Sequence, residues 1–272
     1  MLAASPPPRD DGTVDRTPGT EAADFYGGLV ADAYALLKSE TFDAERYVAF
    51  VDTFGEPGLE IGCGDGHPLL TLVAATLDVE GVDSSPDMLA RAADAADAAG
   101  LEVELHQARM EDLDLRRSYR TIYLAGPTFE LLPDDEHALA ALHAMRRHLH
   151  PDGTVMIPLW TPTPTDPAVL GVAREAFDGA GALLRYTPLA EHYDVATRTR
   201  TTRVLYERIH PNGRGERVER DWIIHWQTPR TLAGLARDAG LAILMVHPEE
   251  DLLEGTPGEE STVYLQHAPS TP

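Results

Sequence analysis

Short apolar runs alternate with amphipathic stretches through the middle of the chain, between about residues 58 and 160. A short apolar run bounded by turn residues is typical of a buried strand, whereas apolar residues three and four positions apart indicate a helix. Strands that alternate with helices form a parallel sheet covered on both faces. The pattern predicts strands at 58–61, 78–83, 102–106, 120–125 and 154–159, and helices at 67–76, 86–99 and 134–149.

The alternation stops after Trp160, where a proline-rich connector and a long segment of alternating side chains follow. The turn signal Pro211-Asn212-Gly213 favours a hairpin. We predict a helix at 168–179 and two antiparallel strands at 197–210 and 216–227. The alternation then resumes, with a helix at 229–239 and strands at 241–246 and 262–267.

The beginning of the chain has a different composition. Residues 1–22 are rich in Pro, Asp, Thr and Gly and hold almost no large apolar residues, which predicts a flexible tail. From Phe25 apolar residues fall on one helical face, and a second helix is expected at 44–53. We expect residues 23–272 to form one domain, made of N-terminal helices (23–57), a core (58–160), an insertion (161–227) and a C-terminal part (228–272).

Three glycines at alternate positions, Gly62, Gly64 and Gly66, follow the first strand of the core. Glycine lets the backbone approach a ligand closely because no Cβ stands in the way. A dinucleotide site needs a different spacing, Gly-x-Gly-x-x-Gly, and the nearby carboxylate of Glu60 suits a cationic amino-acid-like group better than a pyrophosphate. The loop therefore favours S-adenosylmethionine over NAD.

A second acidic residue, Asp83, ends the next strand. In doubly wound folds an acidic residue about 20 positions past the glycine loop accepts hydrogen bonds from ribose hydroxyls. Asp83 lies at that distance, so the two signals support one nucleoside site.

Three segments now stand in order: Glu60-x-Gly62-x-Gly64-x-Gly66, Gly81 to Leu89, and Arg109 to Leu113. They resemble the successive cofactor motifs of class I S-adenosylmethionine-dependent methyltransferases. The resemblance implies an α/β fold with a doubly wound, mainly parallel, seven-stranded sheet whose last strand is antiparallel. It also implies that the β insertion is a lid over a small-molecule acceptor, as in sugar N-methyltransferases and glycine N-methyltransferase.

The resemblance also implies which residues bind S-adenosylmethionine. Glu60 either accepts from the cofactor ammonium or fixes the glycine loop, Tyr26 competes with Tyr34 for the cofactor carboxylate, and Asp112 competes with Glu111 for the adenine. Met88 flanks the adenine or is ordinary core. The expected set is Tyr34, Glu60, Gly62, Gly64, Gly66, Asp83, Ser84, Met88, Met110, Glu111 and Ala125.

Residues that bind or activate the acceptor are harder to predict. Methyl transfer from a sulfonium is an in-line displacement in which positioning supplies much of the rate, and a general base helps a protonated acceptor. We expect Phe129 and Trp226 to contact the acceptor and consider His192, Tyr193 and His225 as candidate bases. For each of these five the alternative is ordinary packing. The acceptor, the choice of N or O, and the oligomeric state are left open.

Composition and charge limit the kinds of partner that the protein can bind. A net charge of −23 opposes nucleic-acid binding. The sequence contains no run of 18 apolar residues, so we expect no membrane span. It has no basic segment followed by an apolar stretch at its start, which argues against a secretory signal. The single cysteine, Cys63, fits a reducing cytoplasm. The scattered histidines predict no metal site. Seven arginines lie between Arg198 and Arg220. They either form a solvated strand face or attract an anionic acceptor.

Two other functions are weighed against methyl transfer. One is a dinucleotide-dependent oxidoreductase, which the glycine spacing opposes. The other is a protein that binds the nucleoside cofactor on this fold without transferring a methyl group.

Overall fold

The computed structural model describes residues 15–16, 25–37, 43–248, 255 and 257–269 of the 272-residue chain. Most of the predicted tail at 1–22 lies outside these residues. Within it, Asp15–Arg16 form a short strand, β1. None of the helices in the described part of the chain has the length and apolar character that a membrane crossing requires.

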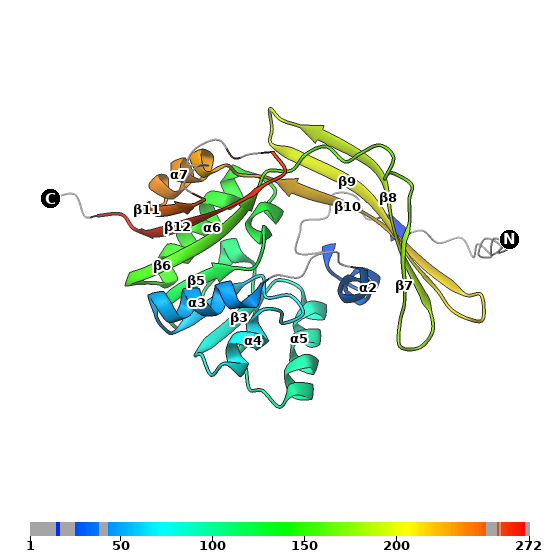
Figure 1. Ribbon diagram of the computed structural model, residues 1–272, viewed down its shortest axis with the longest axis horizontal. Coiled ribbons are helices and arrows are strands. Elements are labelled where there is room, and N and C mark those ends of the chain that lie inside the picture. Colours follow the sequence, from blue (N-terminus) through cyan, green and yellow to red (C-terminus); the bar gives the residue numbers. More distant parts are fainter. Residues whose placement is uncertain (1–14, 17–24, 38–42, 249–254, 256, 270–272) are drawn as a thin grey trace.

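A seven-stranded sheet forms the core, with the strand order β11-β12-β6-β5-β2-β3-β4 (Figure 1). Five neighbouring strands are parallel, and β12 is antiparallel to the strand on either side. The predicted fold class and the antiparallel last strand are confirmed. The strands are β2 (Gly58–Ile61), β3 (Val79–Asp83), β4 (Leu105–Gln107), β5 (Tyr119–Leu124), β6 (Leu149–Trp160), β11 (Leu241–His247) and β12 (Glu260–His267).

Helices cover both faces of this sheet because successive strand residues point to opposite sides. On β5, Ile122 and Leu124 belong to the cluster that α6 and α7 bury, whereas Tyr123 belongs to the cluster that α3 and α4 bury. The sheet is therefore apolar on both faces, as parallel sheets are. The helices are α3 (Ala44–Phe54), α4 (Leu69–Ala74), α5 (Pro86–Ala99), α6 (Asp135–His148) and α7 (Pro229–Asp238).

The boundaries of α5 follow from its ends. Ser85 is the N-cap, and its hydroxyl accepts the Met88 N–H at 3.2 Å, while Pro86 takes the first helical position. Gly100 ends the helix in the left-handed conformation with φ +66°. The predicted helix at 86–99 is confirmed. The strand predicted at 102–106 is shorter and lies at 105–107.

A second sheet, with the order β1-β10-β9-β8-β7, lies beside the core and contains most of the insertion (Figure 1). Its four antiparallel strands are β7 (Arg174–Phe177), β8 (Leu183–Asp194), β9 (Thr199–Ile209) and β10 (Gly215–His225). Helix α2 (Leu29–Leu37) packs its apolar side on this sheet, where Val30 and Ala33 meet Leu184, Val204 and Tyr206.

The helix predicted at 168–179 is wrong. Residues 167–171 form a turn, and the chain continues as strand β7. The physical reason lies at Asp178, whose carboxylate accepts the N–H groups of Ala180 and Ala182 at 2.9 and 2.8 Å. Aspartate followed by glycine closes a turn in this way, so the segment forms a hairpin with β8.

Candidate functional site

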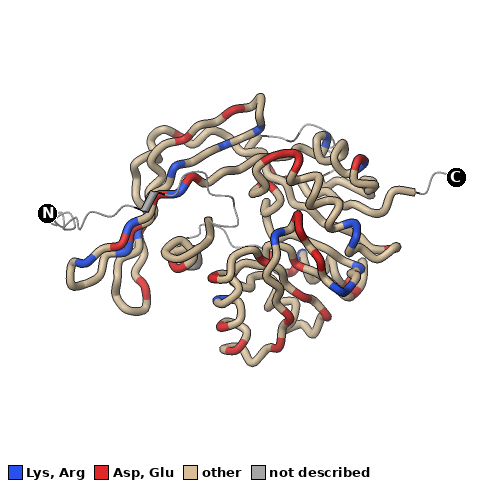
Figure 2. The backbone as a smooth tube through the Cα atoms, turned by 180° about the vertical axis from the view of Figure 1, so that it is seen from behind, with Lys and Arg blue, Asp and Glu red and all other residues tan. Residues whose placement is uncertain are grey.

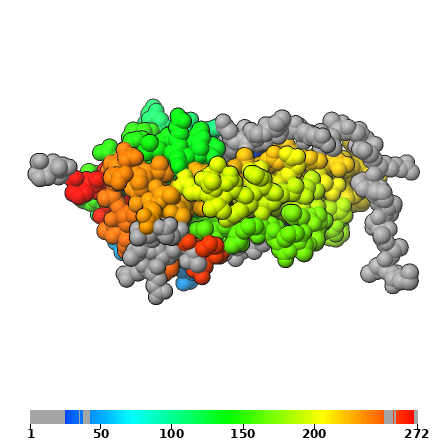
Figure 3. Space-filling model, turned by 90° about the horizontal axis from the view of Figure 1, so that it is seen from above, coloured from blue at the N-terminus to red at the C-terminus, as the bar shows by residue number. Residues whose placement is uncertain are grey.

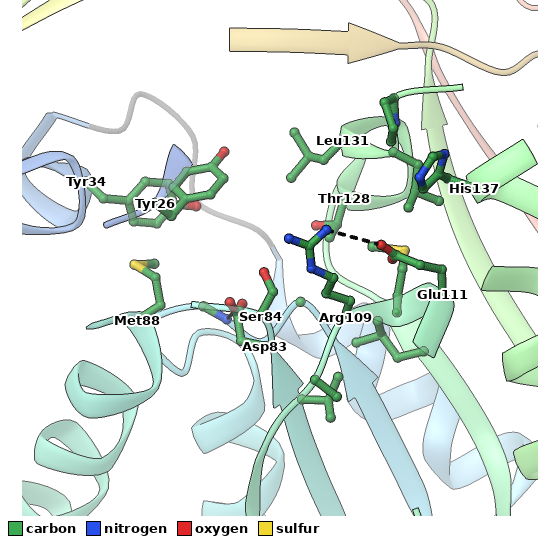
Figure 4. A pocket seen from close by; sticks show the side chains of 18 residues that line it. Tyr26, Tyr34, Asp83, Ser84, Met88, Arg109, Glu111, Thr128, Leu131 and His137 are labelled. Carbon is green, nitrogen blue, oxygen red and sulfur yellow. Dashed lines mark hydrogen bonds and ion pairs between the residues drawn. The ribbon is translucent and has the colours of Figure 1, made fainter. Parts of the chain in front are cut away.

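A cavity lies at the carboxyl ends of the parallel strands, between the core and α2 (Figure 4). In open α/β sheets this edge is where ligands bind. Three walls face it: the glycine loop with the end of β3, the segment after β4, and the turn after β5. It is lined by Tyr26, Tyr34, Ile61, Gly62, Gly64, Val82, Asp83, Ser84, Met88, Ala108, Arg109, Met110, Glu111, Thr128, Leu131, Leu132, Pro133 and His137.

The glycine loop leaves no room for side chains. Gly62, Gly64 and Gly66 have φ values of +74°, +55° and +94°, a region that other residues rarely adopt. A Cβ on Gly62 would lie 2.4 Å from Cγ2 of Thr128. The loop therefore requires glycine at this position both for its backbone conformation and for its contact with the turn after β5.

Asp83 holds two parts of the site together. Its Oδ2 accepts the Gly64 N–H at 2.8 Å, and its Oδ1 accepts the Ser85 N–H at 2.8 Å, so one carboxylate fixes the glycine loop and the start of α5. Burial raises the pKa of Asp83, and the backbone N–H groups oppose that rise. Each oxygen keeps a lone pair that a sugar hydroxyl can use.

Glu60 lies beneath the loop and is fully buried. Neither carboxylate oxygen has a hydrogen-bond partner among the described residues. Burial raises the pKa of Glu60 well above its usual range, and the Asp83 and Asp65 carboxylates raise it further, while the nearby Tyr123 hydroxyl opposes them. A buried carboxylate with no cation beside it and only a tyrosine hydroxyl nearby destabilises the fold, and a cationic ligand group would relieve that cost.

Two tyrosines close the cavity from the side of α2. Tyr26 and Tyr34 meet edge to face, with ring centroids 5.5 Å apart and an interplanar angle of 87°. The Ser85 hydroxyl donates to the Tyr26 carbonyl at 2.6 Å, and the Gly28 N–H donates to Asp87 at 2.6 Å. The competing candidates Tyr26 and Tyr34 thus both face the cavity, which Figure 4 shows.

Charged side chains gather on the opposite wall. Arg109 and Glu111 form an ion pair at 3.9 Å, and Glu111 belongs to the short helix η1 (Met110–Asp112) (Figure 4). His137 lies on the first turn of α6, where its Nδ1 is 2.7 Å from Oδ1 of Asp134. That carboxylate raises the pKa of His137.

Several predicted cofactor residues come together here, and others do not. Tyr34, Gly62, Gly64, Asp83, Ser84, Met88, Met110 and Glu111 line the cavity. Glu60, Gly66, Asp112 and Ala125 are absent from its lining among the described residues. Ala125 lies behind the wall, where its carbonyl accepts the Thr128 hydroxyl at 2.8 Å. Arg109, which opens the third motif, also lines the cavity, as do Thr128 and His137, which were not among the residues predicted to bind the cofactor.

The candidate acceptor residues lie away from the cavity. Phe129 is buried in the core. Tyr193 and Trp226 stack with centroids 5.1 Å apart, and the Tyr193 hydroxyl donates to the Pro162 carbonyl at 3.0 Å. His192 is exposed on β8.

His225 is buried in the second sheet, where burial lowers its pKa. Its Nε2 lies 3.5 Å from Oδ1 of Asp135 and 3.3 Å from Nη2 of Arg198. These contacts fix the ring at the junction between the second sheet and α6. Its role as a base stays a prediction.

Four of the seven arginines in the strip on the second sheet form ion pairs with acidic residues. Arg203 contacts Asp221 at 3.0 Å on the neighbouring strand, and Arg208 contacts Asp32 of α2 at 2.7 Å. Figure 2 shows basic and acidic residues side by side along these strands. The pairing favours a solvated strand face over an anion-binding surface.

Comparison with known proteins agrees with this geometry. Residues 59–153, which hold the glycine loop, Asp83 and the wall after β4, match the family model described as a methyltransferase domain. The part of the chain that forms these walls is therefore similar to a methyltransferase domain.

Two curated relatives methylate nitrogen according to their names. The cypemycin N-terminal methyltransferase of a Streptomyces species is 29% identical over 150 residues, covering 53% of this chain and 57% of the relative. The dTDP-3-amino-3,6-dideoxy-alpha-D-glucopyranose N,N-dimethyltransferase of Streptomyces fradiae is 29% identical over 146 residues, covering 50% and 56%. The chain spans about half the length of the curated relatives it matches.

Similarity of fold extends further. The structure of the CcbJ methyltransferase from Streptomyces caelestis matches with a TM-score of 0.70 at 21% identity, over 90% of this chain and 99% of that one. At this identity the match shows the fold alone. It covers far more of the chain than the family model, whose match is confined to residues 59–153.

Proposed function

We propose that this methyltransferase transfers a methyl group from S-adenosylmethionine to an amine nitrogen of a small molecule. The observation that carries the proposal is the cavity lined by the glycine loop and Asp83, with the carboxylate of Glu60 buried beneath the loop. The names of the two curated relatives favour nitrogen, since one specifies a peptide N-terminus and the other an amino sugar.

The residues present suit this cofactor. Asp83 has lone pairs for the two ribose hydroxyls, and Glu60 suits the ammonium of the methionine part, directly or through the loop that it underlies. Tyr34 of α2 and Tyr26, just before that helix, cover the cavity, and Met110 and Glu111 lie where they could contact the edge of the adenine. When bound, S-adenosylmethionine supplies a sulfonium methyl group that is open to in-line attack.

The chain contributes positioning and exclusion of water. Most residues around the cavity come from the ends of β2, β3, β4 and β5 and from the segments that follow them, so the rigid sheet sets their spacing. Holding both reactants in line supplies a large part of the rate of a displacement. We assign residues 161–227, most of which form the second sheet, as the lid that encloses the acceptor.

Calorimetric titration with S-adenosylmethionine and S-adenosylhomocysteine tests this proposal, with NADH as the control ligand. Wild-type protein is expected to bind both nucleosides and not NADH. In Asp83→Asn an amide N–H faces the backbone N–H of either Gly64 or Ser85, where a carboxylate oxygen accepted before. The substitution should weaken binding of both nucleosides about 10- to 100-fold, because hydrogen bonds to a charged group contribute about 1.5–3 kcal/mol. Binding of NADH without either nucleoside would support the oxidoreductase alternative instead.

A further inference from the structure

The imidazole of His137 lies in the lining of the cavity, on the first turn of α6. Its side chain is 37% exposed, so a ligand in the cavity can reach it. Figure 4 shows His137 on the same side of the cavity as Glu111, with Asp83 across from both. A nucleoside whose ribose is bound by Asp83 can therefore present its base to this wall.

Asp134 holds the imidazole in one orientation. Its carboxylate caps the start of α6, where Oδ1 accepts the backbone N–H of His137 at 2.9 Å and lies 2.7 Å from Nδ1 of the ring. Because a carboxylate only accepts hydrogen bonds, Nδ1 carries a hydrogen. The second ring nitrogen, Nε2, is then the one that can bond to a ligand.

Acidic residues favour the protonated form of this ring. The hydrogen bond to Asp134 raises the pKa of His137, partial burial opposes that rise, and the charges of Asp134, Glu111 and Glu136 raise the pKa further. Arg109, on the same wall, forms an ion pair with Glu111 at 3.9 Å. A protonated imidazole donates from Nε2 as well as from Nδ1.

The neighbours of these two polar groups are apolar. Leu131, Leu132 and Pro133 precede the cap of α6, Met110 begins η1, and all four line the cavity. Ligand sites of this kind combine apolar walls with a few polar groups that fix the orientation of the ligand. Adenine suits such a wall, because its flat ring is apolar on its faces and one edge carries an amino donor beside a ring-nitrogen acceptor.

We infer that His137 and Glu111 bind the base of the cofactor: Glu111 accepts from the exocyclic amino group of adenine, and His137 donates from Nε2 to a ring nitrogen beside that group. This inference rests on the proposed function and makes His137 a specificity-determining residue for adenine. Asp134 is a positioning residue, because it acts only through the imidazole.

Calorimetric titration with S-adenosylhomocysteine across a range of pH measures the contact of His137. This ligand has no sulfonium charge that the imidazolium could repel. Above the pKa of His137 the neutral ring keeps its hydrogen on Nδ1, so Nε2 can no longer donate. The affinity of wild-type protein relative to His137→Ala is therefore expected to be about 10-fold or more higher below that pKa, and the advantage should disappear above it.

Two further variants complete this comparison. His137→Gln keeps an N–H donor that does not titrate, so it should bind more tightly than His137→Ala by a factor that does not change with pH. His143→Ala is the matched control, because His143 lies on the same helix at an exposed position. The control should keep the wild-type affinity and pH profile.

Analogues of S-adenosylhomocysteine identify the atoms that the base contributes. The 1-deaza and 7-deaza analogues each lack one of the two ring nitrogens beside the amino group. With one of the two, wild-type protein and His137→Ala should bind equally at every pH, because the donor has lost its acceptor. A loss in His137→Ala that persists with both analogues would overturn the inference.

S-inosylhomocysteine tests the contact of Glu111, since hypoxanthine has a carbonyl oxygen in place of the amino group. Wild-type protein should bind it about 10-fold or more weakly than S-adenosylhomocysteine, and Glu111→Gln should reduce that difference, because its amide can donate to the carbonyl. Equal binding of the two ligands by wild-type protein, or a wild-type pH profile in His137→Ala, would also overturn the inference. Failure of wild-type protein to bind either S-adenosylmethionine or S-adenosylhomocysteine would instead reject the proposed function.

Discussion

The buried carboxyl group of Glu60 lowers the stability of the fold, and we propose that the same group favours binding of the cofactor ammonium. It is buried without a hydrogen-bond partner among the described residues, and its pKa is raised mainly by burial. A group whose pKa is higher in the folded state stabilises the fold fully below its unfolded pKa, and that contribution is lost as the pH rises through the folded value. Glu60 therefore makes the protein less stable at neutral and alkaline pH than in mild acid.

Glu60→Gln should remove this pH dependence. The melting temperature of the wild-type protein is expected to fall between about pH 5 and pH 8, and that of the variant should fall less. S-adenosylmethionine should bind the variant more weakly, because the ammonium loses a carboxylate nearby. Thermal unfolding across this range checks the first expectation and calorimetry the second. Glu104→Gln, at an exposed position, serves as the control, and an unchanged slope in Glu60→Gln would contradict the argument.

The sequence predicts those site residues whose contacts follow from their spacing along adjacent strands. The glycine loop and Asp83 could be predicted because their spacing along adjacent strands fixes their contact, and Asp83 does bond to Gly64. The hydrogen bond between the Glu130 carboxylate and the Trp160 N–H could not be predicted, since the two residues are 30 positions apart. The guanidinium of Arg200, which lies over the Trp160 ring, comes from the other sheet. Such contacts depend on how the two sheets meet, which periodicity does not encode.

At the scale of elements, α2 is held by one acidic side chain. Asp32 pairs with Arg91 of α5 through one oxygen and with Arg208 of β9 through the other. These contacts link α2 to both the core and the second sheet, while Tyr26 and Tyr34 cover the cavity from the same segment. The position of the cover therefore depends on both ion pairs.

Asp32→Asn should loosen this cover and speed cofactor release. Partly exposed ion pairs contribute about 0.2–1 kcal/mol each, so the dissociation rate of S-adenosylmethionine is expected to rise about 2- to 10-fold. Stopped-flow displacement measures the rate. Asp97→Asn removes an exposed charge from α5 and should leave it unchanged, and equal rates in the two variants would argue against the anchoring role.

Elements were predicted well where helix ends and strand ends carry their own signals. Helix α5 has its cap, its first-turn proline and its terminal glycine in the sequence. The failure at 168–179 has the opposite cause, because two turns and an edge strand share a composition that also suits a helix. Pairing of β7 with β8 decides the outcome there, and that pairing is a tertiary contact.

At the scale of the whole molecule, the charge of −23 bears on how the cofactor arrives. S-adenosylmethionine carries one net positive charge, whereas S-adenosylhomocysteine carries none. A strongly acidic surface accelerates association of a cation, and salt screens that attraction over about 10 Å at 0.1 M. The association rate of S-adenosylmethionine should fall as salt rises, and that of S-adenosylhomocysteine should stay nearly constant. Parallel salt dependence in rapid-mixing experiments would contradict this expectation.

The insertion leaves and rejoins the core at neighbouring points. A Cβ on Gly255 would lie 2.5 Å from Oγ1 of Thr161 and 3.6 Å from Cγ2 of Thr228, so both ends of the inserted segment meet at one glycine. Seen from above, the inserted strands form one body beside the core (Figure 3). A gene that encodes such an arrangement can exchange the inserted strands as one uninterrupted block. Two crossovers, one at each end of the block, would replace these strands and keep the glycine loop, Asp83 and the wall after β4.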